Sequence, residues 1–157
     1  MIAKVYLKPG RDKPIRGRNP WIFSQAIQRT EPADLEPGAL VGIFDSSGER
    51  LGFGYYHPAT TIAVRVLDWG KRPPNIEDLI ARRFENAAEL RRRLISSDTN
   101  CYRLINGDGD GLSGLVVDSY AKVVVLQILT AGMDRLKDLI REHGKWTEPI
   151  AAAPVLA

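Results

Sequence analysis

Short stretches of alternating hydrophobic and polar residues, separated by turn-forming residues, occupy the first seventy positions. They predict five strands, at residues 2–7, 21–27, 39–45, 50–56 and 62–69. Residues 11–18 allow at most a helical turn because Pro14 limits its length, and residues 31–38 are predicted to form a loop. Five short strands with short polar turns favour a small barrel over a parallel sheet. The predicted core of this barrel consists of Val41, Ile43, Phe53, Tyr55, Val64 and Val66.

The pattern changes to helical spacing after a proline-containing boundary at residues 70–74. Apolar residues recur every three or four positions from Ile76 to Ile95, and Asn75 precedes them as a candidate cap. Three further strands, at residues 102–105, 115–118 and 123–129, and a shorter helix at 132–143 are predicted next. The sequence therefore predicts an α+β protein with a β-barrel domain at residues 1–69, a small mixed α/β lobe at 75–143 and an irregular tail at 144–157.

Positive charge is concentrated at the start of the chain. The net charge is +3, but residues 1–30 contain seven basic residues and one acid, whereas the remaining residues contain 15 basic and 18 acidic residues. A concentrated basic patch attracts polyanions more strongly than the same charge spread evenly. Charge alone leaves two interpretations open: a binding surface for nucleic acid, or an ordinary solvated face.

Two motifs resemble a known family. The segments LKPGRDK (residues 7–13) and NPWIFS (residues 19–24) are similar to the PUA module that opens bacterial 23S rRNA 5-methylcytosine methyltransferases. The segment YRLINGDGDGLSGLVVD (residues 102–118) resembles the signature of the small α/β lobe that follows this module. The two motifs lie in the family's order, and the resemblance extends from about residue 4 to about residue 142. It implies a PUA-like β pseudobarrel for the first domain.

The same resemblance bears on catalysis. In that family a methyl-transferring domain follows the two lobes and carries a Gly-rich loop for S-adenosylmethionine, paired cysteines and an Asp-Pro-Pro segment. None of these is present in this sequence. We therefore expect no catalytic residue, cofactor or metal in this chain, and expect either a stand-alone RNA binder or a truncated relative.

The basic opening segment contains the candidate RNA-binding residues. Phosphate contacts need Lys or Arg side chains and exposed backbone N–H groups, and residues 8–13 offer both. PUA modules grip structured RNA beside their first helix and the adjoining strand, which the resemblance places at about residues 11–21. The candidate residues are Lys8, Arg11, Lys13, Arg16, Arg18 and Asn19.

Other candidate sites are weaker. Trp21 could stack on a base, but its position in a strand favours the core. Residues 106–111 imitate the start of a calcium-binding loop, yet Val117 occupies the position of the bidentate acid, which favours a Gly-rich turn between strands. Cys101 is expected to be a small buried hydrophobic residue. His57 and His143 are too isolated for a metal site or a triad, and are expected at turns or surfaces.

The function indicated by these features is binding of structured RNA, ribosomal RNA above all. One alternative is the substrate-recognition part of an S-adenosylmethionine-dependent rRNA cytosine-5 methyltransferase, with a separate methyltransferase subunit as partner. Another is a protein-interaction module or homodimer that pairs through an unprotected strand at residues 123–129. The single cysteine excludes an internal disulfide, and neither a signal peptide nor a long apolar stretch is present, so we expect a cytoplasmic protein without membrane association.

Overall fold

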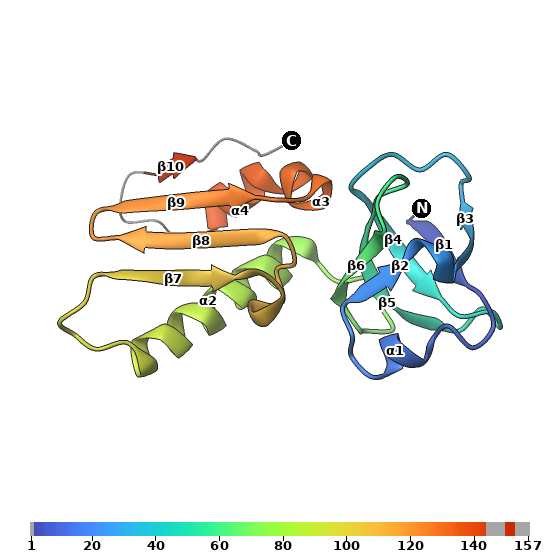
Figure 1. The fold of residues 1–157 in the computed structure, drawn as a ribbon, viewed down its shortest axis with the longest axis horizontal. Coiled ribbons are helices and arrows are strands. Elements are labelled where there is room, and N and C mark those ends of the chain that lie inside the picture. The colour runs from blue at the N-terminus through green and yellow to red at the C-terminus, as the bar shows by residue number, and fades with distance from the viewer. Residues whose placement is uncertain (1, 144–149, 153–157) are drawn as a thin grey trace. The chain divides into compact units, whose positions relative to one another are not determined.

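The computed structural model describes residues 2–143 and 150–152, and the chain divides into two compact units, Met1–Pro74 and Asn75–Ala157 (Figure 1). Both units combine strands with helices, which confirms the predicted α+β class. The boundary between the units lies at the end of the segment 70–74, whose prolines suggested it in the sequence. Among the described residues, no helix is both long enough and apolar enough to span a membrane.

The first unit is built on a curled six-stranded sheet. Its strands are β1 (Ala3–Leu7), β2 (Trp21–Phe23), β3 (Ile27–Glu31), β4 (Ala39–Phe44), β5 (Arg50–Tyr56) and β6 (Ile62–Asp68). They follow the order β2-β6-β5-β4-β1-β3. All neighbours are antiparallel except β1 and β4, which run parallel. The curled sheet forms the β pseudobarrel that was predicted for this domain.

One predicted strand of the barrel was wrong. Residues 21–27 form two elements, because a 3₁₀ turn (Ser24–Ala26) separates β2 from β3. β2 pairs with β6 whereas β3 pairs with β1, so this turn carries the chain from one edge of the sheet to the other. β3 also takes in Glu31, the first residue of the predicted loop. The sequence therefore contains six barrel strands rather than five.

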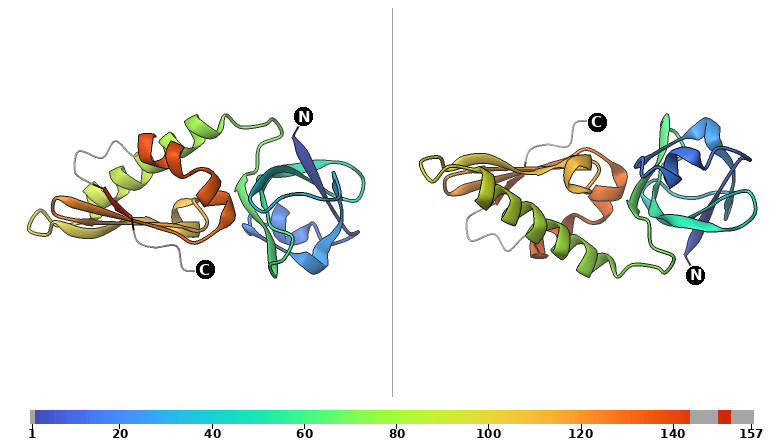
Figure 2. Two further views of the ribbon diagram at one scale, coloured as in Figure 1. Left: turned by 90° about the horizontal axis from the view of Figure 1, so that it is seen from above. Right: turned by 90° about the horizontal axis from the view of Figure 1, so that it is seen from below.

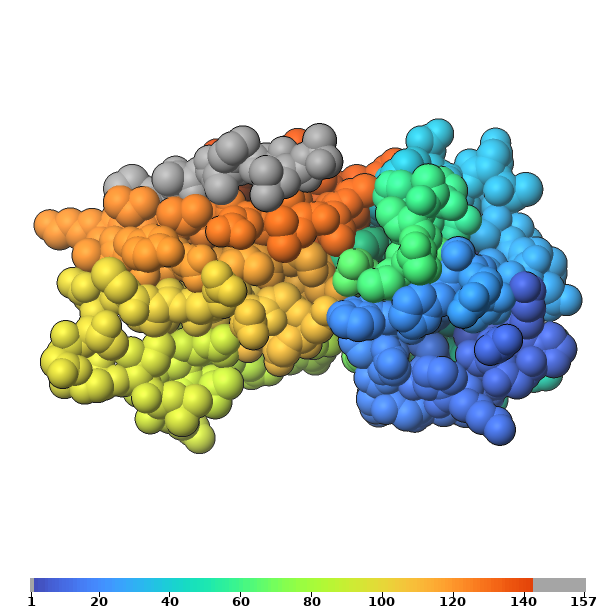
Figure 3. Space-filling model, viewed as in Figure 1, coloured from blue at the N-terminus to red at the C-terminus, as the bar shows by residue number. Residues whose placement is uncertain are grey.

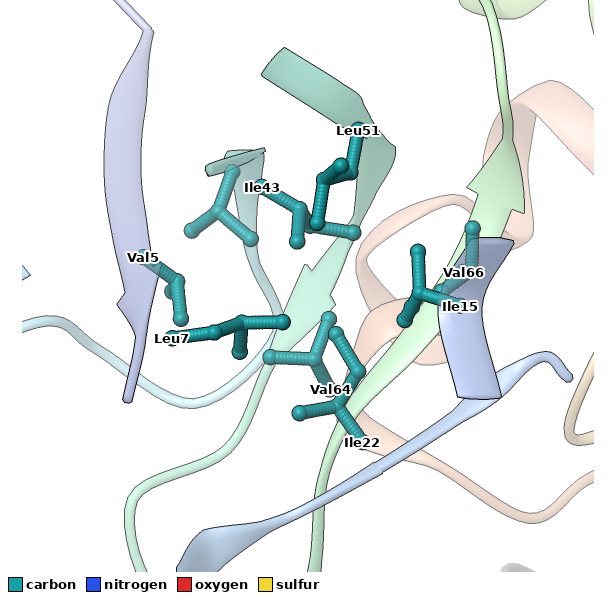
Figure 4. Packing of buried hydrophobic residues seen from close by; sticks show 9 residues of the cluster. Val5, Leu7, Ile15, Ile22, Ile43, Leu51, Val64 and Val66 are labelled. Carbon is teal, nitrogen blue, oxygen red and sulfur yellow. The ribbon is translucent and has the colours of Figure 1, made fainter. Parts of the chain in front are cut away.

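Apolar side chains from several strands and from α1 (Lys13–Arg16) fill the barrel (Figure 4). The predicted core residues Val41, Ile43, Val64 and Val66 belong to this cluster, and Ile15 joins it from α1. Phe53 and Tyr55 are buried as predicted, although they are not among the buried residues of this cluster. The prediction that Trp21 lies in the core was wrong. Trp21 is 38% exposed and its neighbour Ile22 is 3% exposed, so Ile22 occupies the inward position of the strand.

The second unit packs helices on one face of a second sheet. Its strands are β7 (Cys101–Asn106), β8 (Leu115–Tyr120), β9 (Val123–Ile128) and β10 (Ile150–Ala152), in the order β10-β9-β8-β7. The helices are α2 (Ile76–Leu94), α3 (Ala131–Arg135) and α4 (Lys137–His143). α2 and α4 lie on the same side of this sheet (Figure 2). The helix predicted at 132–143 is therefore two short helices, with Leu136 between them.

Two predictions about the second unit need correction. The tail 144–157 was expected to be irregular, but Ile150–Ala152 forms β10, which pairs in parallel with β9. As a result β9 has a neighbour on each side and is not the unprotected edge that the interaction-module alternative required. The long helix was predicted correctly, and its cap is Asn75, whose Oδ1 accepts hydrogen bonds from the backbone N–H groups of Glu77 at 3.0 Å and Asp78 at 3.5 Å.

Candidate RNA-binding surface

The N-terminal basic segment, residues 8–18, runs from the end of β1 through α1 along the surface of the first unit. The space-filling view shows this part of the chain in blue on the visible face (Figure 3). Lys8, Arg11, Lys13 and Arg18 are exposed, and within the described residues none of them has a carboxylate within 4.0 Å. Four of the six candidate residues therefore present positive charge to solvent without an acidic partner.

Arg16 differs from its neighbours because it is surrounded by acids. Its guanidinium donates to Asp12 at 2.6 Å, to Asp45 at 2.9 Å and to Glu49 at 2.8 Å. The hydrogen bonds to Asp12 and Glu49 raise the pKa of Arg16, and the same contact lowers the pKa of the Asp12 carboxyl. Arg16 thus links α1 to the turn between β4 and β5, and much of its charge is already compensated inside the unit.

The acidic turn that faces Arg16 is itself well ordered. Asp45 Oδ1 accepts hydrogen bonds from the Ser47 hydroxyl at 2.7 Å and from the backbone N–H groups of Ser47 and Glu49, each at 2.9 Å. These contacts, the Ser47 hydroxyl first among them, lower the pKa of Asp45. Asp45 is therefore held as a carboxylate that can anchor Arg16 without moving.

The end of α1 fixes the position of Arg18. Arg18 N–H donates to Ile15 O, and Asn19 N–H donates to Pro14 O, both at 2.9 Å. This pair of bonds forms a Schellman motif, in which the residue at the position of Arg18 has a left-handed backbone and is commonly glycine. Arg18 has a φ of 65°. Its guanidinium lies over the Trp69 ring, 5.4 Å from the ring centroid, and Trp69 Nε1 donates to Ile15 O at 3.2 Å.

Asn19 has a local structural contact. Its Oδ1 accepts a hydrogen bond from the backbone N–H of Trp21 at 2.9 Å, which fixes the turn that leads into β2. β2 then presents two exposed aromatic side chains, because Trp21 and Phe23 alternate with the buried Ile22. The structure therefore places aromatic rings directly after the basic segment.

A pocket of about 270 Å³ lies in the first unit next to α1. Its lining residues are Ile15, Arg16, Arg18, Glu49, Arg50, Leu51, Trp69 and Lys71. Arg16 and Arg18 were candidate residues in the sequence, whereas Arg50, Trp69 and Lys71 were not. The missed residues come from the start of β5 and the segment after β6, and only the fold brings them to α1. No local motif in the sequence marks them.

The candidate sites of the second unit have structural explanations. The turn at Gly107–Asp110 joins β7 to β8, as predicted, and Asp110 accepts a hydrogen bond from the backbone N–H of Asn106 at 2.6 Å. Asp110 also forms a two-bond ion pair with Arg91. Within the described residues no cluster of metal-binding side chains occurs. Cys101 is exposed at the start of β7, so the prediction that it is buried was wrong.

One of the two histidines has a described side chain. His57 follows β5 in a turn, where its Nδ1 accepts a hydrogen bond from the backbone N–H of Ala59 at 3.1 Å. It therefore lies at a turn, as the sequence analysis expected. His143 is the last residue of α4, and its side chain is outside the described part of the chain.

Comparison with known proteins supports this description of the first unit. The family described as the PUA-like domain matches residues 5–69. This range includes β1 from Val5 onward, the strands β2 to β6, α1 and Trp69, and the match confirms the predicted PUA-like pseudobarrel. The basic segment and the lining of the pocket, apart from Lys71, therefore lie inside the matched domain.

Several curated relatives match most of this chain. The protein named ribosomal RNA large subunit methyltransferase I from Photobacterium profundum is 37% identical over 143 residues, which is 90% of this chain and 36% of the relative. Proteins of the same name from Alteromonas mediterranea and Aliivibrio fischeri are each 38% identical, over 145 and 143 residues. The chain thus spans about a third of the length of the relatives it matches.

Solved structures share the fold. SMU.776, described as a methyltransferase complexed with SAH, superposes with a TM-score of 0.76 at 20% identity, covering 91% of this chain and 36% of that protein. A SAM-dependent methyltransferase from Streptococcus mutans superposes with a TM-score of 0.75, also at 20% identity, covering 91% of this chain and 37% of that protein. At this level of identity the superpositions establish the fold of the chain.

Proposed function

Because the chain contains a PUA-like domain at residues 5–69 and is homologous over about nine-tenths of its length to ribosomal RNA large subunit methyltransferases I, we propose that it binds structured ribosomal RNA. The observation that carries this proposal is the exposed basic segment beside α1. Lys8, Arg11, Lys13 and Arg18 have no carboxylate partner within the described residues, so their charge is available to phosphate groups.

The six candidate residues divide into two roles in this proposal. Lys8, Arg11, Lys13 and Arg18 contact RNA phosphates, each releasing condensed counterions when it does so. Arg16 and Asn19 support the surface instead, because Arg16 is bound by three carboxylates and Asn19 fixes the turn before β2. The contacts of Arg16 keep α1 attached to the β4–β5 turn and so hold the neighbouring cations in place.

The exposed rings of β2 add a second kind of contact. Trp21 and Phe23 have side chains on the outward side of the strand, directly after the basic segment. A base that is unstacked from the RNA can stack on such a ring, and stacking of this kind contributes about 1–3 kcal/mol per base. The proposal therefore assigns phosphate binding to the basic segment and base stacking to Trp21 or Phe23.

The first experiment is capture of RNA by the tagged chain. The chain is incubated with total bacterial RNA, and the retained RNA is sequenced. We expect enrichment of large-subunit rRNA fragments by the parent chain and loss of that enrichment in the triple variant Lys8→Gln, Arg11→Gln, Lys13→Gln. A chain in which Arg92 and Arg93 are changed to Gln serves as the control, because those arginines are equally basic but contact Glu89. Equal retention of rRNA by the parent and the triple variant would contradict the proposed surface.

A second candidate function is recognition of substrate RNA for a methyltransferase. The 37–38% identity to proteins named ribosomal RNA large subunit methyltransferase I favours it. In this version the chain binds the rRNA and another polypeptide segment transfers the methyl group. Incubation of the chain alone with labelled S-adenosylmethionine and unmodified rRNA is then expected to give no transfer above background. Transfer that disappears on changing Cys101→Ser would overturn this division of labour.

A further inference from the structure

The pocket beside α1 combines several cations, the Trp69 ring and an unusual backbone conformation at Arg18. We propose that the Arg18–Trp69 pocket, lined by Arg18, Arg50, Trp69 and Lys71, binds one phosphate group of the bound RNA. This inference rests on the proposed function, since it assigns a specific subsite to the RNA-binding surface. The pocket is continuous with that surface because Arg16 and Arg18 belong to both.

The backbone conformation of Arg18 is unusual for arginine. A residue with a side chain is less stable in the left-handed conformation than in the right-handed one, and glycine avoids this cost. The chain nevertheless has arginine at the Schellman position, with a φ of 65°, although glycine would suit the local structure better. What arginine adds at this position is its side chain, which the left-handed backbone directs over Trp69 at the pocket. Strain kept at one position in this way is characteristic of functional sites.

Arg50 is a partly buried cation that lines the pocket. Its guanidinium lies over two aromatic rings, 5.0 Å from the centroid of Phe44 and 4.9 Å from that of Phe53, and its Nη1 donates to Lys71 O at 3.2 Å. Within the described residues its Nε is buried and has no hydrogen-bond partner. A buried donor without an acceptor is unfavourable, and so is a partly buried cation without an anion. An anion in the pocket would compensate the charge that the protein leaves uncompensated.

The distribution of acids supports an anionic ligand. Glu49 is the one acidic residue that lines the pocket, and its carboxylate contacts Arg16 at 2.8 Å and Lys71 at 4.0 Å. Arg18 and Arg50 have no carboxylate within 4.0 Å among the described residues. Lys71, 84% exposed, adds a further cation. The pocket therefore offers two guanidinium groups that lie over aromatic rings, and a planar guanidinium binds phosphate with two parallel hydrogen bonds.

Two kinds of ligand offer the phosphate group that this pocket would bind. One is a nucleotide within an RNA chain, and the other is a free mononucleotide. We commit to the RNA chain, because Lys8, Arg11 and Lys13 are exposed cations of the same basic segment outside the pocket lining, and an RNA chain can contact them while one of its phosphates occupies the pocket. The experiment therefore measures binding of an RNA chain and of a free mononucleotide separately.

The test compares Arg18→Gly, Arg50→Gln and the double variant, with Arg72→Gln as a control of equal charge change outside the pocket lining. Binding of transcribed large-subunit rRNA is measured against salt concentration. If Arg18 and Arg50 share one phosphate, loss of that contact flattens the slope of log K against log salt by about 0.7–0.9. The double variant should flatten it no further, because only one phosphate is released. Arg72→Gln should leave the slope unchanged.

Thermal unfolding separates binding from folding. Arg18→Gly removes the strained conformation, so its melting temperature should equal or exceed that of the parent while its RNA affinity falls.

Titration with adenosine monophosphate tests the free mononucleotide as the source of the phosphate, and we expect much weaker binding than with rRNA. The pocket proposal is overturned if the double variant binds rRNA with the parent's affinity and salt slope. It is also overturned if the pocket binds the mononucleotide tightly while the affinity for rRNA stays unchanged. In both cases the proposed function survives if the triple variant of Lys8, Arg11 and Lys13 still loses rRNA. Failure of the parent chain to bind any rRNA would contradict both proposals.

Discussion

Residues 8–18 of the first unit contain five basic residues, and residues 82–93 of α2 in the second unit also contain five. The two segments use these residues differently. In α2, Arg91 contacts Asp110, and both Arg92 and Arg93 contact Glu89. In the first segment, Arg16 is the one basic residue with a carboxylate partner among the described residues.

Local geometry explains this difference. A helix brings residues three and four positions apart together, so Glu89 reaches two arginines of its own helix without any help from the rest of the fold. The first segment has a single acid, Asp12, and its four-residue helix gives that acid one partner at this spacing, Arg16. The number of basic residues in a segment therefore does not measure its free positive charge. The available charge depends on the acids that the fold places within reach.

The largest effect is expected at the buried ion pair of the second unit. Side-chain exposure is 14% for Arg91 and 7% for Asp110, and two hydrogen bonds of 2.7 Å join them. Changing Arg91 to Ala leaves the Asp110 charge buried without its partner, which should lower the free energy of unfolding by about 3–5 kcal/mol. Urea denaturation measures this change. If the loss of unfolding free energy were as small as that of an exposed ion pair, the Arg91–Asp110 pair would not stabilise the second unit in the way this account requires.

A smaller effect is expected for the acid that anchors Arg16. Asp45→Asn weakens charge-assisted hydrogen bonds and should lower the free energy of unfolding by about 1–3 kcal/mol at pH 7. The folded pKa of Asp45 lies below its ordinary value of 3.8, so its stabilising contribution is complete above that value and is lost as the pH falls through the lowered pKa. The stability difference between parent and variant should therefore shrink below about pH 4. A difference that stays constant down to pH 2 would show that the Asp45 charge is not responsible.

The smallest effect is expected for the exposed pairs of α2. Arg92 and Arg93 are solvent-exposed partners of Glu89, and pairs of this kind contribute about 0–1 kcal/mol. Changing either residue to Gln should therefore alter the free energy of unfolding by less than about 1 kcal/mol. Chemical denaturation at low and high salt is the measurement, and any small loss should disappear at high salt. A loss of several kcal/mol that persists in salt would indicate a structural role for these arginines.

Much of the fold followed from sequence periodicity. The alternation of residues 39–45, 50–56 and 62–69 located β4, β5 and β6, and the helical spacing after Asn75 located α2. These elements are long enough for their periodicity to be visible. β2 is only three residues long, and its single buried residue, Ile22, lies between two larger aromatic residues. Size favoured Trp21 as the core residue, whereas the actual phase of the strand is set by its pairing with β6.

The candidate site was only partly predictable. Local charge marked Lys8, Arg11, Lys13 and Arg18, and all four are exposed. The sequence could not show that Arg16 is compensated, because two of its three carboxylates lie about thirty residues away, in the turn between β4 and β5. For the same reason the pocket was not found, since Arg50 and Trp69 reach α1 only through the curvature of the sheet. The burial of Cys101 was predicted wrongly, because the type of a small apolar residue does not show whether it lies at the end of a strand or at its centre.

The most direct test of the central claim is the salt dependence of rRNA binding for two matched charge variants. One variant replaces Lys8 and Lys13 with Gln, and the other replaces Arg92 and Arg93, which both contact Glu89, with Gln. Each loses two positive charges. If Lys8 and Lys13 each contact one phosphate, their variant should flatten the slope of log K against log salt by about 1.4–1.8, whereas the α2 variant should leave the slope nearly unchanged. Equal flattening in both variants would mean that the chain attracts RNA through its overall charge, and would contradict a specific N-terminal surface.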